Sequence, residues 1–153
     1  MIIDKTKGHI RDFSTDNKRL EEIRVTHEDM ARPHQKLTAE DGEIFAVSLP
    51  RGEYLFPGAV LYADEERIVY VDLEPEEVLV IRPVGDTELA RAAYNVGNMH
   101  QDAYIADEGI LVAYDEIMEG IIKKLGIDCA KAQRKLNGIR AKVVYDGEHH
   151  HHE

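Results

Sequence analysis

Hydrophobic residues in the first half of the chain occur in short runs that turn residues separate. The clearest runs are Glu43–Leu49, Val60–Tyr62 and Arg67–Asp72, which are apolar and partly alternating. Proline, glycine and acidic clusters lie between them. Short strands spaced in this way are typical of small β modules. We therefore expect residues 1–74 to form a small all-β domain.

The second half has a different period. Its near-continuous apolar run, Glu77–Arg82, predicts a buried central strand. From Thr87 to Val96 and again from Asp115 to Leu125, apolar residues recur every three or four positions, which predicts two helices. The remaining strands are expected at Gln101–Ala106, Ile110–Tyr114 and Ala141–Tyr145. This order is the ferredoxin-like βαββαβ arrangement, so we predict an α+β fold in which residues 75–146 form that domain.

Local signals mark the ends of both helices. Thr87 and Asp115 are expected to cap them, and Gly97 and Gly126 to end them. The residues expected to share one helical face are, in the first helix, Leu89, Ala92, Ala93 and Val96, and, in the second, Ile117, Ile121 and Leu125 with Met118 and Ile122 beside them.

Composition excludes several classes of protein. The 153 residues carry 30 acidic against 19 basic side chains, a net charge of -11, without the basic stripe that a nucleic-acid binder needs. The single cysteine, Cys129, allows neither an intrachain disulfide nor a thiolate metal cluster. The N-terminus does not resemble a signal peptide, and no run approaches the roughly 18 apolar residues of a membrane span. We expect a cytoplasmic protein that does not interact with membranes.

The histidines are the strongest chemical signal. Four of the eight are consecutive, His149 to His152, in a polar segment, residues 147–153, that we expect to be a disordered tail. Consecutive imidazoles can wrap a metal ion, and imidazole suits nickel, copper and zinc alike. An affinity-tag remnant is the alternative for this run. His100 follows the first helix of the second domain, and its position alone does not distinguish a ligand from a solvated side chain.

Other chemistry finds little support. The sequence contains no GxxxxGK[ST], HExxH or GxSxG motif, so we expect no enzyme. Cys129 has no recognisable histidine partner nearby and is interpreted as a partly buried small hydrophobe. A locally basic segment is either an exposed helical face or a docking surface for an acidic partner. Its members are Lys131, Arg134, Lys135, Arg140 and Lys142.

Several segments, taken in order, resemble the UreE family of urease accessory proteins. The most specific is Tyr94-Asn95-Val96-Gly97-Asn98-Met99-His100, followed by Ile105 and by Ile110–Asp115. Gly8-His9-Ile10, Pro57–Tyr62 and Val78–Pro83 are similar too. The likeness covers nearly the whole chain, and the histidine-rich end fits it.

This resemblance implies a homodimeric nickel metallochaperone. It implies an N-terminal β domain likened to the peptide-binding domains of co-chaperones, and a ferredoxin-like domain that binds metal and dimerises. The histidine of the family's Gly-Asn-Arg-His motif, matched here by His100, would meet its symmetry mate and bind one nickel between subunits. A two-fold axis lets one histidine per chain supply two ligands.

The chain departs from the family pattern in two places. Met99 stands where relatives usually carry arginine, which puts any role of that arginine in doubt. Tyr114-Asp115-Glu116 stands where some relatives carry histidines of an auxiliary site, so that site is not carried over.

The leading hypothesis is nickel delivery. The metal ligands would be His100, His149, His150, His151 and His152, and the recipient would be the urease apoprotein together with the urease accessory GTPase complex. A nickel store or buffer is one alternative. The other is a peptide-binding scaffold in which metal binding is incidental.

Overall fold

The computed structural model describes residues 1–141, so the tail histidines His149 to His152 lie outside the described residues. The chain divides into two units, one from Met1 to Glu74 and one that begins at Pro75. Each unit has its own hydrophobic core. No described helix is long and apolar enough to cross a membrane.

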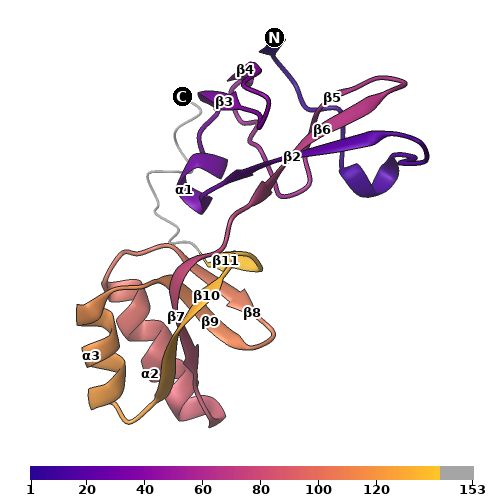
Figure 1. The fold of residues 1–153 in the computed structure, drawn as a ribbon. Helices are drawn as coiled ribbons and strands as arrows, with labels where there is room; N and C mark the ends of the chain where they lie inside the picture. The colour runs from indigo at the N-terminus through magenta and orange to yellow at the C-terminus, as the bar shows by residue number, and fades with distance from the viewer. Residues whose placement is uncertain (142–153) are drawn as a thin grey trace. The chain divides into compact units, whose positions relative to one another are not determined.

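The first unit consists of two three-stranded sheets and two very short helices (Figure 1). One sheet has the order β1-β4-β3, with β1 (Ile2–Ile3), β4 (Ile44–Ser48) and β3 (His34–Thr38). The other has the order β2-β6-β5, with β2 (Arg19–Val25), β6 (Arg67–Leu73) and β5 (Val60–Ala63). The short helices are η1 (Ile10–Asp12) and α1 (His27–Met30).

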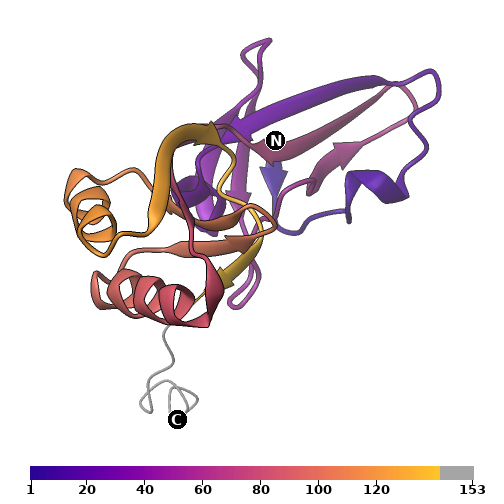
Figure 2. The ribbon, with the colours of Figure 1, turned by 90° about the horizontal axis from the view of Figure 1, so that it is seen from below.

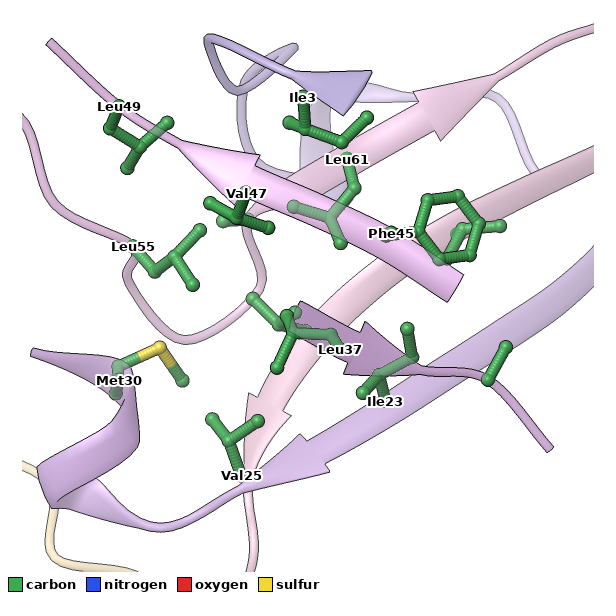
Figure 3. Close-up of a cluster of buried hydrophobic side chains, with 14 of the residues drawn as sticks. Ile3, Ile23, Val25, Met30, Leu37, Phe45, Val47, Leu49, Leu55 and Leu61 are labelled. Atoms are coloured by element: carbon green, nitrogen blue, oxygen red, sulfur yellow. The ribbon is translucent and has the colours of Figure 1, made fainter. Parts of the chain in front are cut away.

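The core of the first unit is built from the inward side chains of both sheets. In β4 the alternation is plain, since Phe45 and Val47 are buried while Ile44 and Ser48 are exposed. Figure 3 shows these side chains converging with those from β2, β3 and α1. Burial of one face of each sheet therefore holds the two sheets together.

Three strands of the first unit, β4, β5 and β6, lie where the hydrophobic pattern predicts them. The pattern missed β1, β2 and β3. All three are edge strands, and β2, Arg-Leu-Glu-Glu-Ile-Arg-Val, buries only Ile23 and Val25. Because charged residues fill its outer positions, its apolar alternation is too short to recognise.

The second unit confirms the predicted ferredoxin-like order. Its elements are β7 (Glu76–Arg82), α2 (Gly85–Asn98), β8 (Ala103–Ala106), β9 (Gly109–Ala113), α3 (Glu116–Lys124), β10 (Asp128–Arg134) and a further short strand β11 (Ile139–Ala141). They form an antiparallel sheet of order β10-β7-β9-β8-β11. Figures 1 and 2 show α2 and α3 side by side on one face of this sheet.

Both faces of the central strand β7 are covered. Leu79 and Ile81 belong to the cluster beneath the helices, with Met118 and Ile122 of α3. Val78 and Val80 point to the opposite face, where Leu136 packs against them. Leu136 lies in the segment that joins β10 at one edge of the sheet to β11 at the other. This explains why β7 reads as a continuous apolar run.

The strand predicted to complete the βαββαβ order, Ala141–Tyr145, is not the one that does so. The strand that completes the βαββαβ order is β10, which pairs with β7. Of the predicted strand, only Ala141 lies among the described residues, and it ends β11. β10 has few large apolar side chains, because one side of this edge strand faces solvent. The position of β10 is set by backbone hydrogen bonding to β7, which the hydropathy of the sequence does not reveal.

Both predicted ends of α3 are confirmed, whereas the predicted start of α2 is wrong. Asp115 caps α3 by accepting from the N–H groups of Ile117 and Met118, and Gly126 follows with φ +74°. α2 instead begins before Thr87 and has no side-chain cap at Val84. Glu88 Oε1 accepts the Val84 N–H at 3.0 Å, so the first turn is closed from inside the helix.

Candidate metal site around His100

His100 lies exposed just beyond α2. The helix continues through Gly97, which the sequence pattern placed at its end, and Met99 is the C-terminal cap. His100 itself takes the left-handed conformation, with φ 56°, and its N–H donates to the carbonyl of Gly97 at 3.1 Å. The imidazole is thus carried by the residue that turns the chain out of the helix.

The face of α2 predicted to be buried is only half covered. Ala92 and Val96 are buried, whereas Leu89 is 49% exposed and Ala93 is exposed as well. Leu89, Ala93 and Gly97 recur at four-residue spacing and form one exposed, uncharged stripe along the helix toward His100. The four apolar residues that the sequence pattern placed on one buried face therefore lie on two surfaces. Two of them face the core and two are exposed to solvent.

The second helix carries a similar exposed position. Met118 and Ile122 are fully buried, while Ile117, predicted to lie on the main stripe, is 67% exposed. Ile117 lies in the first turn of α3, two residues after Asp115. Uncovered apolar side chains therefore occur on both helices of this unit.

A hydrogen bond links the residue after His100 to the start of α3. Gln101 Nε2 donates to Asp115 Oδ2 at 2.9 Å. The Met118 N–H, the Gln101 amide and the Ile117 N–H all lower the pKa of Asp115, so the carboxylate stays charged. Gln101 Oε1 is buried without a hydrogen-bond partner in residues 1–141. Sequence reasoning recognised Asp115 only as a helix cap and missed its bond to Gln101, because the two residues are fourteen positions apart.

One chain supplies few metal ligands. Within residues 1–141 no group of three or more His, Cys, Asp or Glu side chains is placed to hold a metal ion. His100 offers a single imidazole, and a stable site for a borderline metal needs several donors. A metal ion at His100 would therefore need further ligands from outside residues 1–141 of this chain.

The other described histidines have local roles in the first unit. His9 Nδ1 accepts the Arg11 N–H at 3.1 Å, and its ring stacks on Phe56 with centroids 6.0 Å apart. His34 Nδ1 lies 3.0 Å from the hydroxyl of Ser48. His27 is buried. None of them belongs to a group of three or more possible metal ligands in residues 1–141.

The basic segment is neither a helical face nor a free patch. Lys131 and Arg134 lie on β10 and Arg140 on β11. Each is within 4 Å of a carboxylate, in the pairs Lys131–Glu77, Arg134–Glu108 and Arg140–Asp102. Acidic neighbours therefore balance the charge of these three cations, while Lys142 lies outside the described residues.

Cys129 behaves as expected for a small hydrophobe. It is half-buried and packs against the cluster beneath the helices. Burial raises the pKa of its thiol, which keeps it protonated and poorly nucleophilic.

A hollow of about 870 Å³ lies in the first unit. It lies between β2 and the turn after β3, and it is lined by Arg19, Leu20, Glu21, Glu22, Arg24, Ala39, Glu40 and Asp41. Two of the acids are paired with neighbouring arginines, Glu21 with Arg19 and Glu22 with Arg24.

Comparison with known proteins extends the likeness over the whole chain. Residues 3–74 match the family described as UreE urease accessory protein, N-terminal domain, and residues 76–153 match its C-terminal domain. Among curated relatives named Urease accessory protein UreE, that of Bacillus cereus is 39% identical over 139 residues, covering 89% of this chain and 92% of the relative. Those of Staphylococcus saprophyticus and Staphylococcus epidermidis are 32% and 30% identical, each covering 90% of this chain and 93% of the relative.

Proposed function

The chain belongs to the UreE family of urease accessory proteins, and from this premise we propose that it binds Ni(II) through His100 at a homodimer interface and delivers the ion for urease active-site assembly. It acts as a carrier and catalyses no reaction. Its recipients are the urease apoprotein and the urease accessory GTPase complex, and it works in the cytoplasm.

The observation that carries this proposal is the setting of His100. It is an exposed imidazole at the end of a helix whose outer face is apolar and uncovered. A second copy related by a two-fold axis doubles every such residue, so one histidine per chain becomes a pair. A site with few protein ligands and access from solvent exchanges its metal readily, as a carrier requires.

The uncovered side chains of the second unit support a homodimer. Leu89, Tyr94 and Ile117 are 49%, 76% and 67% exposed. They belong to α2 and α3, and contiguous exposed apolar surface is typical of interaction sites. A dimer contact over α2 would remove the stripe from water and bring two His100 side chains toward each other.

Met99 lies against the core. Its side chain is half-buried and packs on the cluster beneath the helices. A methionine there anchors the end of α2, and it offers no charge for a partner or a second contact to the metal. In this chain the metal site therefore depends on His100 without an adjacent arginine.

The tail histidines complete the proposal. His149, His150, His151 and His152 would capture nickel and pass it to the His100 pair. Zinc or copper would bind as well in vitro, because imidazole discriminates poorly among them. Imidazole must be unprotonated to bind a metal, so the loaded protein should release nickel on acidification.

Reconstituted urease activation tests delivery. Nickel-loaded protein is mixed with urease apoprotein and the GTPase complex, in the presence of a chelator that removes free nickel. The His100→Ala form should activate far less urease than the unaltered protein, while removal of residues 147–153 should slow loading and leave delivery by loaded protein intact.

The alternatives give different results. Nickel binding that survives His100→Ala and disappears with the tail would indicate a nickel store or a tag artefact. Partner capture that is indifferent both to nickel and to His100→Ala would indicate a peptide-binding scaffold. Either result would contradict the carrier proposal.

A further inference from the structure

His100 holds a backbone conformation that its side chain does not favour. Among the described residues other than glycine, only His100 and Asn17 have a positive φ. The His100 N–H donates to Gly97 at 3.1 Å and the Met99 N–H to Val96 at 3.2 Å. A glycine would make the same end-of-helix bonds with less strain. Contacts outside the helix must therefore help to hold His100 in place.

Gln101 provides such a contact. Its Nε2 donates to Asp115 Oδ2 at 2.9 Å. The other oxygen of that carboxylate, Oδ1, accepts the N–H of Ile117 at 2.8 Å and the N–H of Met118 at 2.9 Å. Two backbone bonds fix the carboxylate at the start of α3, so it is a rigid anchor. The residue after His100 is thereby tied to a second helix.

The rest of the Gln101 amide adds little to the fold. Its Oε1 is buried, and no donor in residues 1–141 reaches it. Turning the amide over would bring this oxygen against the Asp115 carboxylate, so its orientation is fixed. The free energy gained from the bond to Asp115 is offset by the unpaired buried acceptor. Gln101 therefore constrains the chain more than it stabilises it.

We propose that Gln101 is a positioning residue for His100: its bond to Asp115 holds the turn that presents the imidazole to the metal. This inference rests on the proposed nickel-binding role of His100. A ligand held in its binding conformation loses less entropy when the metal arrives. Removing an outer contact of this kind typically weakens metal binding about 10–100-fold although the ligand itself remains.

The test uses the full chain with His149 to His152 replaced by alanine, so that calorimetry measures His100 alone. Gln101→Leu should raise the nickel Kd about tenfold or more. The same change removes the unpaired oxygen together with the bond, so the melting temperature should stay the same or rise. A purely structural role predicts the reverse, a lower melting temperature with unchanged nickel affinity.

Gln35→Leu is the matched control. Gln35 lies in the first unit, and its amide donates to the backbone carbonyls of Asp29 and Arg32. Its loss should lower the melting temperature and leave nickel binding unchanged. Equal loss of nickel affinity in the two variants would overturn the proposal.

An exchange of the two polar groups tests the bond itself. Gln101→Glu combined with Asp115→Asn keeps the net charge and restores a donor–acceptor pair with its direction reversed. Asparagine also caps helices, so α3 keeps its start. The double variant should regain most of the affinity that Gln101→Leu loses. If it binds nickel as weakly as Gln101→Leu, the tether is not the cause.

A metal-free measurement separates this inference from the proposed function. Hydrogen exchange of the His100 amide should be faster in Gln101→Leu than in the unaltered protein, because the turn is released. Equal exchange would contradict the tether whatever the metal does. If exchange is faster in Gln101→Leu but His100→Ala does not change nickel binding, the tether is supported and the carrier role is rejected.

Discussion

The two units of this chain differ in how completely their buried polar groups are paired. In the first, Arg67 lies half-buried between Glu21 and Glu43, 3.3 and 2.8 Å from their carboxylates, and its guanidinium lies 5.1 Å from the ring centre of Tyr62. Charged groups that the fold takes from water are thus paired there. In the second unit, the surroundings of His100 include exposed apolar side chains and a buried amide oxygen that has no partner among residues 1–141.

Exposed apolar side chains occur in both units, so the difference lies in the buried amide oxygen of Gln101. A fold that is complete as one chain has reason to satisfy its buried polar groups. An unmet buried acceptor in the residue after His100 therefore indicates a region that a further contact could complete. The second unit, and within it the end of α2, is where we expect another copy and a metal ion.

The largest effect should come from removing Arg67. Arg67→Met leaves Glu43 without its half-buried cation, while Glu21 keeps Arg19, and should lower the free energy of unfolding by about 3 kcal/mol. Arg134→Met is the control from the second unit. Arg134 and Glu108 are 43% and 36% exposed, and such surface pairs contribute about 0–1 kcal/mol. Urea denaturation measures both, and equal losses would remove the contrast between the units.

A glycine contact in the first unit should have the next largest effect. Gly58 has φ +89°, and a Cβ there would lie 2.5 Å from the ring of His9. Gly58→Ala should cost about 2–3 kcal/mol, because backbone strain and overpacking add. Gly52→Ala shares the positive φ, at +87°, and has open space around its Cβ. Thermal unfolding of the two variants isolates the clash, and a cost at Gly52 as large as that at Gly58 would disprove it.

The exposed stripe of α2 gives a prediction about assembly. Leu89→Lys should change the stability of the monomer by less than about 0.5 kcal/mol, since the side chain is on the surface. It should nevertheless disrupt the dimer, because two like charges would meet across the axis. Leu20→Lys is the control, from a leucine that is 46% exposed in the first unit. Sedimentation velocity should find dimers of Leu20→Lys and monomers of Leu89→Lys.

The smallest expected effect is on the stability of the protein at acidic pH. Asp64 accepts the hydroxyl of Tyr62, which is the main cause, and the N–H groups of Arg67 and Glu66, and together these lower its pKa from 3.8 to about 2. A carboxyl whose folded pKa is lowered stabilises the protein above its ordinary pKa and stops doing so as the pH falls through the folded value. Asp64→Asn should therefore flatten the loss of stability between pH 4 and pH 2. Melting temperatures measured across that window that run parallel in both proteins would contradict this.

Local signals in the sequence were reliable where the cause is local. Asp115 and Gly126 bound α3 because a side-chain cap and a positive φ act within one turn. The ferredoxin-like order could also be predicted, since its central strand and two helices have strong periodicity. Edge strands such as β2 and β10 could not, because their outer positions are charged and only pairing places them.

In the candidate site, too, some features could be predicted from the local sequence and others could not. The position of His100 after α2 follows from the helix period, although the helix ends later than Gly97. The exposure of Leu89 could not be predicted, since an apolar residue that meets a second chain has the same pattern as one in the core. The bond between Gln101 and Asp115 joins two segments whose proximity only the fold creates.

Native mass spectrometry of the chain without residues 147–153, titrated with nickel, tests the central claim most directly. We expect a dimer that holds one nickel ion, and a His100→Ala dimer that holds none. Nickel bound to monomers, or a nickel-bound dimer that survives His100→Ala, would contradict the claim that a second copy completes the site.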